Sequence, residues 1–119
     1  MAPPPASTEL QSFKAEFFKA LAHPVRILIL ETLRARERSV QELQAVLDLD
    51  QPTVSSQLAV LRRTHVVAAR KEGTTVRYAL GDPHVGALLD VARRIFNNQL
   101  TGTQTMLRAL RRERRPARR

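Results

Sequence analysis

The sequence predicts a mainly α-helical domain with one small β-hairpin: a winged helix-turn-helix in the order four helices, two strands and a last helix. Residues 39–64 contain two short amphipathic segments joined by a polar turn, as a helix-turn-helix requires. Residues 66–80 contain two strand-like runs separated by a turn at Gly73. The first and last segments carry apolar stripes that so small a domain can hardly cover by itself, which favours a homodimer.

The composition is that of a small domain without redox or membrane chemistry. The chain has 119 residues, of which 43% are hydrophobic, enough for one modest core. It has no cysteine, which excludes disulfides, thiolate metal sites and thiol-based redox sensing. No apolar run approaches the roughly 20 residues that span a bilayer, and the N-terminus lacks a signal-peptide pattern. We therefore expect a cytoplasmic protein with no membrane contact and no cofactor.

The net charge of +9 suggests nucleic-acid binding, but most of it lies at one end of the chain. Residues 108–119 hold seven Arg and one Glu. Such a tail is either a solvated, disordered end or an extra phosphate-binding segment, and the sequence leaves both alternatives open. We expect disordered tails over residues 1–7 and 112–119, with the winged domain over residues 8–111. The net charge alone therefore does not predict DNA binding by the winged domain, and its motifs have to do so.

Two helices are expected before the helix-turn-helix. An apolar stripe at helical spacing predicts the first over residues 9–21, with Ser7 or Thr8 placed to cap it. His23 is expected at the boundary, because the proline that follows it suits the first turn of a new helix. The second helix, residues 24–34, is apolar around most of its circumference and should form the buried centre of the domain.

The helix-turn-helix carries a cap at each helix start. Ser39 begins the third helix, and Glu42 three residues later completes a capping-box pattern. Asp50 is a good N-cap for the fourth helix, and Pro52 fits its first turn. The side chains expected to face inward are Val40, Leu43, Val46 and Leu47 on the third helix and Val54, Leu58 and Leu61 on the fourth.

The outer side of the fourth helix is small, rich in hydroxyl groups and free of acidic residues that would repel phosphates. Ser, Thr and Gln side chains can donate and accept hydrogen bonds at base edges, and the helix N-terminus offers free amides to a phosphate. A helix pair alone also occurs in bundles that bind no DNA, so this face is what favours DNA. The expected base or phosphate contacts are Thr53, Ser55 and Ser56, then Gln51 and Gln57, with Arg62 and Arg63 positioning the duplex.

A hairpin over residues 66–80 would form the wing. Its second run alternates Val76, Tyr78 and Leu80 with polar or small residues, as a half-buried strand does. Gly73 supplies the permissive backbone that a hairpin turn needs. The cations expected to contact an adjacent minor groove or its phosphates are Arg70, Lys71 and Arg77.

The last helix is expected to follow Gly81-Asp82-Pro83, and Thr101-Gly102-Thr103 to kink or divide it before its pattern resumes near Met106. Its apolar stripe and that of the first helix are expected to pair across a two-fold axis. The alternative is that both stripes pack on the domain's own core. The predicted dimer contacts are Leu10, Phe13 and Phe17 on the first helix and Leu88, Ala92, Ile95 and Phe96 on the last.

This order of segments resembles the ArsR/SmtB family of bacterial winged-helix repressors, over about residues 10–100. The most specific matches are Ala20–Arg26, Gln51–Leu58 and the Glu72-Gly73 turn before Val76-Arg77-Tyr78. The resemblance implies a dimeric DNA-binding transcriptional regulator, usually a repressor that an inducer releases. His65 stands where the family commonly has glycine, so we expect it at a positive φ, which His tolerates better than most residues.

The departures from the family concern its metal sites. Arsenic, cadmium and persulfide sensors use cysteines, and the segment Ser39–Leu47, where the metal sensors carry theirs, has none. In the family's zinc-type site, Asp82 and His84 match the first two ligands, but Ile95 and Asn98 replace the others. Two ligands per subunit cannot close a tetrahedral zinc site. We therefore expect no metal, keep Asp82 and His84 as weak candidates, and interpret Asp82 as a helix N-cap.

The sequence thus predicts a sequence-specific regulator, a repressor in the family's usual role, that binds a pseudo-palindromic operator as a homodimer. Its partners would be duplex DNA, a second copy and an inducer that the sequence does not identify. The chief alternative is a winged-helix protein-interaction module without specific DNA binding. An enzyme is the weakest hypothesis, because three scattered histidines and no phosphate-binding loop offer no catalytic constellation.

Overall fold

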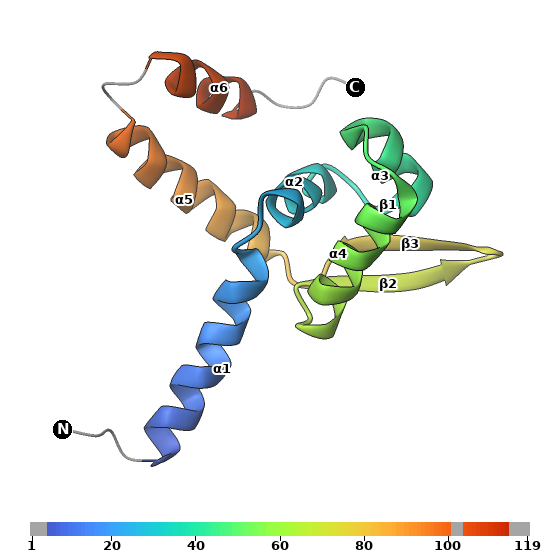
Figure 1. Cartoon of the computed structure of the whole chain (residues 1–119), viewed down its shortest axis with the longest axis horizontal. Coiled ribbons are helices and arrows are strands. Elements are labelled where there is room, and N and C mark those ends of the chain that lie inside the picture. Colours follow the sequence, from blue (N-terminus) through green and yellow to red (C-terminus); the bar gives the residue numbers. More distant parts are fainter. Residues whose placement is uncertain (1–4, 101–103, 115–119) are drawn as a thin grey trace. The chain divides into compact units, whose positions relative to one another are not determined.

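The structure, a computed structural model, describes residues 5–100 and 104–114 and confirms the predicted fold class (Figure 1). The elements are α1 (Pro5–Leu21), α2 (Pro24–Leu33), β1 (Arg38–Ser39), α3 (Val40–Leu47), α4 (Gln51–Arg63), β2 (Val67–Glu72), β3 (Thr75–Leu80), α5 (His84–Gln99) and α6 (Gln104–Arg114). The chain divides between Asp82 and Pro83 into two compact units, the first holding α1 to β3 and the second α5 and α6. Within the described ranges, no helix has the length and apolar character needed to cross a bilayer.

The core of the first unit lies where α2, α3 and α4 pack together and meet the base of the hairpin. The helix-turn-helix residues predicted to face inward are mostly confirmed, but Val46 is 54% exposed. Val40, Leu43 and Leu47 share one stripe at i, i+3 and i+7, and Val46 lies about a quarter turn outside it. The fully buried side chains are Ile29, Leu30, Leu43, Val54, Leu58, Leu61, Val66 and Val67.

Local capping sets the two helices of the helix-turn-helix as predicted. The Ser39 hydroxyl accepts from the Glu42 N–H at 3.1 Å, and the Glu42 carboxylate accepts from the Ser39 N–H at 3.0 Å, which completes the capping box. At the start of α4, the Asp50 carboxylate accepts from the Thr53 N–H at 2.8 Å. The start of α4, the predicted recognition helix, is therefore anchored by its own sequence.

The first two helices meet at a histidine cap. His23 is the N-cap of α2, where its Nδ1 accepts from the Val25 N–H at 3.1 Å, so the predicted boundary is confirmed. The expected caps of α1 are wrong, because this helix begins at Pro5 and both Ser7 and Thr8 lie inside it. Proline suits the first turn of a helix, which accounts for the earlier start.

The sheet contains one strand more than predicted. The strands run antiparallel in the order β1-β3-β2, with Ser39 opposite Arg77 at one edge and Glu72 opposite Thr75 at the hairpin end. Gly73 has φ 65° in the turn, as expected. The hairpin projects away from the helices as a wing (Figure 1). The two-residue strand β1 escaped prediction because it is too short to show any alternation.

The end of α4 forms a Schellman motif around His65, whose φ of 63° confirms the predicted positive value. The Val66 N–H donates to the Leu61 carbonyl at 2.9 Å and the His65 N–H to the Arg62 carbonyl at 3.1 Å. The Gly81 N–H donates to the Val66 carbonyl at 2.8 Å, so the end of β3 is tied to the same turn. The geometry at Gly81 leaves no space for a side chain, because a Cβ there would lie 2.3 Å from the His65 carbonyl oxygen.

The second unit is less buried than the first. In α5 and α6 only Val85 and Leu110 are buried among the described side chains. The residue directly before α5 is Pro83, which makes no side-chain cap bond. The helical φ and ψ of Pro83 are those of a first helical residue, so the cap at Asp82 stays a prediction. The predicted break at residues 101–103 lies outside the described residues, and the domain boundaries at 8 and 111 remain predictions.

Candidate nucleic-acid interface

The outer face of the recognition helix holds most of the predicted DNA contacts. Ser56, Arg62, Arg63 and Gln51 are exposed, and Thr53 and Ser55 are half-buried. Ser56 donates its hydroxyl to the Thr53 carbonyl at 3.1 Å, which leaves its oxygen free to accept. Gln51 donates its amide to the Ser55 hydroxyl at 2.8 Å, so Ser55 keeps its own hydrogen to donate.

Gln57 lies on a different side of α4 from these residues. Arg26 of α2 donates to the Gln57 side-chain oxygen at 3.2 Å and to the Lys19 carbonyl at 3.4 Å. A guanidinium only donates hydrogen bonds, so the amide oxygen of Gln57 must be the atom that faces α2. The structure therefore joins Gln57 to the neighbouring helix and does not bring it onto the outer face with Ser56.

A groove of about 450 Å³ separates the recognition helix from the wing. Two of its lining residues, His65 and Tyr78, were not among the predicted contacts. The strand alternation had placed Tyr78 on the half-buried side, and its ring lies at the groove because the wing leaves that side partly open. The groove is lined by Ser55, Leu58, Ala59, Arg62, Arg63, His65 and Tyr78.

Two of the three wing cations, Arg70 and Arg77, have acidic partners. Arg77 donates to the Glu42 carboxylate at 2.9 Å and lies 3.5 Å from that of Glu37 and 3.8 Å from that of Glu72. Arg70 hydrogen-bonds Glu37 and lies 3.6 Å from Glu72. Lys71, a predicted contact near the tip, is exposed and makes no ion pair with any described residue.

These contacts stabilise the charged forms of the acidic groups. The hydrogen bond from Arg70 lowers the pKa of Glu37, and the Ser39 N–H, followed by the Arg77 charge, lowers the pKa of Glu42. The Thr53 side chain and N–H lower the pKa of Asp50 in the same way. Because each pKa is lower in the folded protein, this stabilisation is complete above the ordinary glutamate value of 4.5 and is lost as the pH falls through the folded-state values.

We therefore expect the Tm to fall as the pH is lowered from about 5 to about 3, and to fall less in the Glu42→Gln variant. Glutamine can still accept the Ser39 N–H but has no carboxylate to protonate. Circular-dichroism melting curves across this range test the prediction. Glu9→Gln, which removes an exposed carboxylate of α1, is the control and should follow the wild type. An equal fall in all three proteins would mean that the Glu42 contacts do not contribute.

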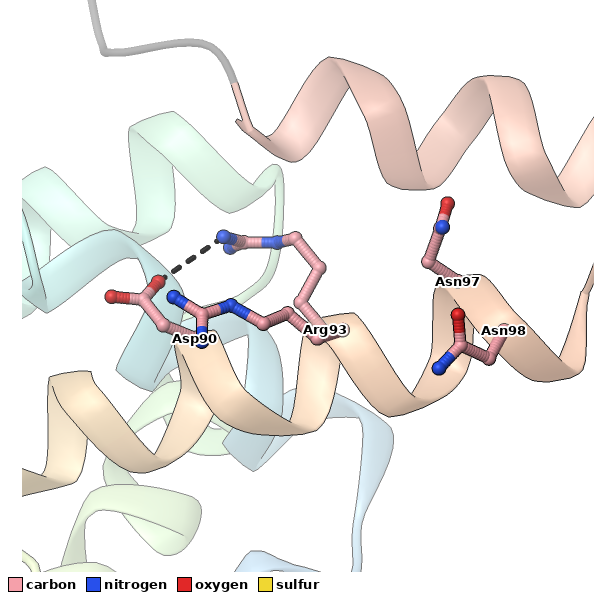
Figure 2. A pocket seen from close by; sticks show the side chains of 5 residues that line it. Asp90, Arg93, Asn97 and Asn98 are labelled. Atoms are coloured by element: carbon pink, nitrogen blue, oxygen red, sulfur yellow. Dashed lines mark hydrogen bonds and ion pairs between the residues drawn. The ribbon is translucent and has the colours of Figure 1, made fainter.

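A second polar hollow, of about 580 Å³, lies along α5 (Figure 2). Asp90 accepts from Arg93 at 3.1 Å, and Arg93 also lies 3.9 Å from Glu113 of α6. Arg94, Asn97 and Asn98 complete the lining. The sequence did not predict a site at these residues, although their i, i+3, i+4, i+7 and i+8 spacing follows one helix face.

The residues predicted for metal and dimer sites are exposed or half-buried. Asp82 and His84 are both exposed, and no group of three or more possible metal ligands occurs in the described part of the chain. Phe13 of α1 is 75% exposed, and Ile95 and Phe96 of α5 are each about half exposed. Of the other predicted dimer contacts, Leu10 is exposed and Phe17, Leu88 and Ala92 are half-buried. Each helix therefore presents uncovered apolar surface in the single chain.

The chain is similar to several bacterial regulators. The family profile described as "Bacterial regulatory protein, arsR family" matches residues 23–68. An uncharacterized HTH-type transcriptional regulator of Mycobacterium tuberculosis, Rv0081, is 46% identical over 106 residues, 88% of this chain and 93% of its own. The crystal structure of Rv0081 superposes with a TM-score of 0.73 over 83% of this chain and 96% of that chain.

Two further relatives extend this comparison. The biofilm growth-associated repressor of Agrobacterium fabrum is 39% identical over 94 residues, 79% of this chain and 80% of its own. A homodimeric winged helix-turn-helix DNA-binding domain from Mycobacterium bovis is 29% identical, with a TM-score of 0.75 over 84% of this chain and 94% of that domain. The helix-turn-helix, the wing and these matches agree, and the chain belongs to the ArsR/SmtB family of winged helix-turn-helix transcriptional regulators.

Proposed function

We propose that the protein is a transcriptional repressor that binds a pseudo-palindromic DNA operator as a homodimer in the cytoplasm. The observation that carries the proposal is the outer face of α4, which presents hydroxyl groups and two arginines without any acidic side chain. Such a face can enter a major groove, where hydroxyl groups meet base edges and guanidinium groups meet phosphates. The relatives of the chain include a protein described as a repressor and one described as a DNA-binding domain.

The role proposed for each residue of this face depends on which hydrogen-bond donor or acceptor its side chain can still offer to DNA. Ser56 can accept and Ser55 can donate at base edges, and Thr53, in the first turn of α4, is a further proposed contact. Arg62 and Arg63, in the last turn of α4, would bind the DNA backbone. They line the protein groove between α4 and the wing. Gln51 is a further contact at the helix start. Gln57 would support α4 through its contact with α2, since its amide oxygen already accepts a hydrogen bond from Arg26.

A dimer would place two such helices on one side of the duplex. The exposed apolar side chains of α1 and those of α5 each support self-association, because exposed apolar patches commonly mark contact surfaces. Two recognition helices then enter major grooves about 34–36 Å apart, one turn of B-DNA. The proposed inducer is a ligand other than a metal held by cysteines, since the chain has none.

The test is specific DNA binding by the recognition face. Bound sites are mapped across the genome, and the strongest is used in mobility shifts with unrelated DNA as competitor. We expect the Ser56→Ala/Arg63→Ala double variant to bind this site about tenfold or more weakly at fixed salt. A matched control, Ser12→Ala/Arg36→Ala, removes an exposed serine and arginine outside α4 and should bind normally.

The possible results separate the hypotheses. Unchanged affinity in the recognition-face variant would show that this face is not the contact surface. A wild-type protein that binds its mapped sites no better than competitor DNA would instead favour the protein-interaction module.

A further inference from the structure

The wing is joined to the helix-turn-helix through one arginine. Arg77 lies opposite Ser39 in the pairing of β3 with β1, and Ser39 is also the N-cap of α3. One oxygen of Glu42, Oε1, accepts both the Ser39 N–H at 3.0 Å and the Arg77 guanidinium at 2.9 Å. The same carboxylate therefore connects the root of the wing to the first turn of the helix that precedes the recognition helix.

Acidic side chains outnumber basic ones around this connection. Three carboxylates, those of Glu37, Glu42 and Glu72, surround the guanidinium groups of Arg70 and Arg77. The Arg77 side chain is only 18% exposed, whereas that of Arg70 is 53% exposed. A phosphate that approached Arg77 would have to displace carboxylates from a half-buried site and would be repelled by them.

We propose that Arg77 is a positioning residue, which fixes the angle of the wing against α3, and that Lys71 is the cation with which the wing contacts the DNA backbone. This inference rests on the proposed DNA binding. It divides the three predicted wing contacts by their surroundings: Arg77 is held by acidic groups, Arg70 mainly secures Glu37, and Lys71 alone is unpaired and close to the tip.

The chemistry of arginine makes the division testable. Arg77 reaches Glu42 through Nη2 and Glu37 through Nε, so it uses two different nitrogens of the planar guanidinium for two different carboxylates. Lysine offers a single ammonium and cannot reproduce both contacts, but it serves well as a point charge for a phosphate. If Arg77 positions the wing, Arg77→Lys should bind the operator as weakly as Arg77→Gln. If Arg77 contacts a phosphate, Arg77→Lys should bind more tightly than Arg77→Gln.

The experiment measures operator affinity as a function of salt for the full chain and for the Lys71→Gln, Arg77→Gln and Arg77→Lys variants. Each phosphate contact contributes about 0.9 to the slope of log affinity against log salt. For Lys71→Gln we expect a lower slope by about this amount per wing. For both Arg77 variants we expect the wild-type slope with affinity lowered about fivefold to tenfold.

Folding is controlled separately, so that a loss of structure is not mistaken for a loss of contact. Circular-dichroism melts define a temperature at which every variant is folded, and stoichiometric titration gives the active fraction. Glu42→Gln, which leaves the capping acceptor in place, should weaken binding with the wild-type slope. Its effect should not add to that of Arg77→Gln in the double variant.

Two outcomes would overturn the inference. One is a reduced slope in Arg77→Gln that Arg77→Lys restores, since this is the behaviour of a phosphate contact. The other is a wild-type slope and affinity in Lys71→Gln. A wild-type protein without site-specific binding would refute the proposed function instead, and the two failures are therefore distinguishable.

Discussion

Phe13→Glu should leave the protein monomeric and lower its operator affinity about 100-fold or more. Phe13 is 75% exposed in the single chain, so the change removes little from the core of its own protomer. In the proposed dimer, by contrast, a carboxylate would be buried in an apolar surface without a partner, which is unfavourable. Loss of the dimer removes the second recognition helix and with it the gain from binding two half-sites together.

Sedimentation equilibrium and mobility shifts measure the two parts of this prediction. Ser12→Glu is the matched control, because it introduces the same charge on the opposite side of α1, away from the apolar stripe. It should remain dimeric and bind DNA normally. A dimeric Phe13→Glu protein would place the interface elsewhere, and a monomeric one with undiminished affinity would show that one recognition helix suffices.

Gly81→Ala should lower the free energy of unfolding by about 3 kcal/mol, at the upper end of the usual range for overpacking. The added Cβ would lie 2.3 Å from the His65 carbonyl oxygen and 3.2 Å from the Val66 carbonyl carbon. Both are backbone atoms, and hydrogen bonds of the Schellman motif hold them in place. The chain can relieve the clash only by breaking the Gly81–Val66 hydrogen bond or by displacing the end of the recognition helix.

Urea or thermal unfolding followed by circular dichroism tests this value, which corresponds to a fall in Tm of about 10 °C. Gly73→Ala is an instructive comparison. A Cβ there meets no atom within 4 Å, but the residue has φ 65°, so we expect a cost of only about 1 kcal/mol from backbone strain. Equal losses in the two variants would mean that the close approach at Gly81 is not what the protein requires.

The wing shows that neighbouring cations of one motif can have different surroundings in the fold. In the sequence, Arg70, Lys71 and Arg77 form one basic group around a turn. In the fold, two of them meet acidic side chains, and the third does not. The partners of Arg70 and Arg77 lie 33 and 35 residues away along the chain, beyond the range of any local pattern.

The recognition helix likewise has a contact with a distant segment that local spacing does not predict. Spacing along α4 correctly separates Val54, Leu58 and Leu61 from the outer face, because helical geometry alone determines which residues share a side. Spacing could not show that Gln57 would meet Arg26, because that contact depends on how α2 crosses α4. Local spacing therefore placed Gln57 among the expected contacts, whereas the fold joins its side chain to α2.

The positive φ of His65 was predicted through the family resemblance, whereas the sequence by itself determined the helices of the helix-turn-helix, the hairpin and the capping box at Ser39. These features depend on residues a few positions apart, whose periodicity and hydrogen bonds are the same in any fold. Only the tertiary structure decided which cations face solvent. The short strand β1 pairs with β3 and brings Ser39 and Glu42 to Arg77, with Glu37 beside them. The sequence determines which positions carry a positive charge. Whether that charge can contact DNA depends on the side chains that folding brings beside it from elsewhere in the chain.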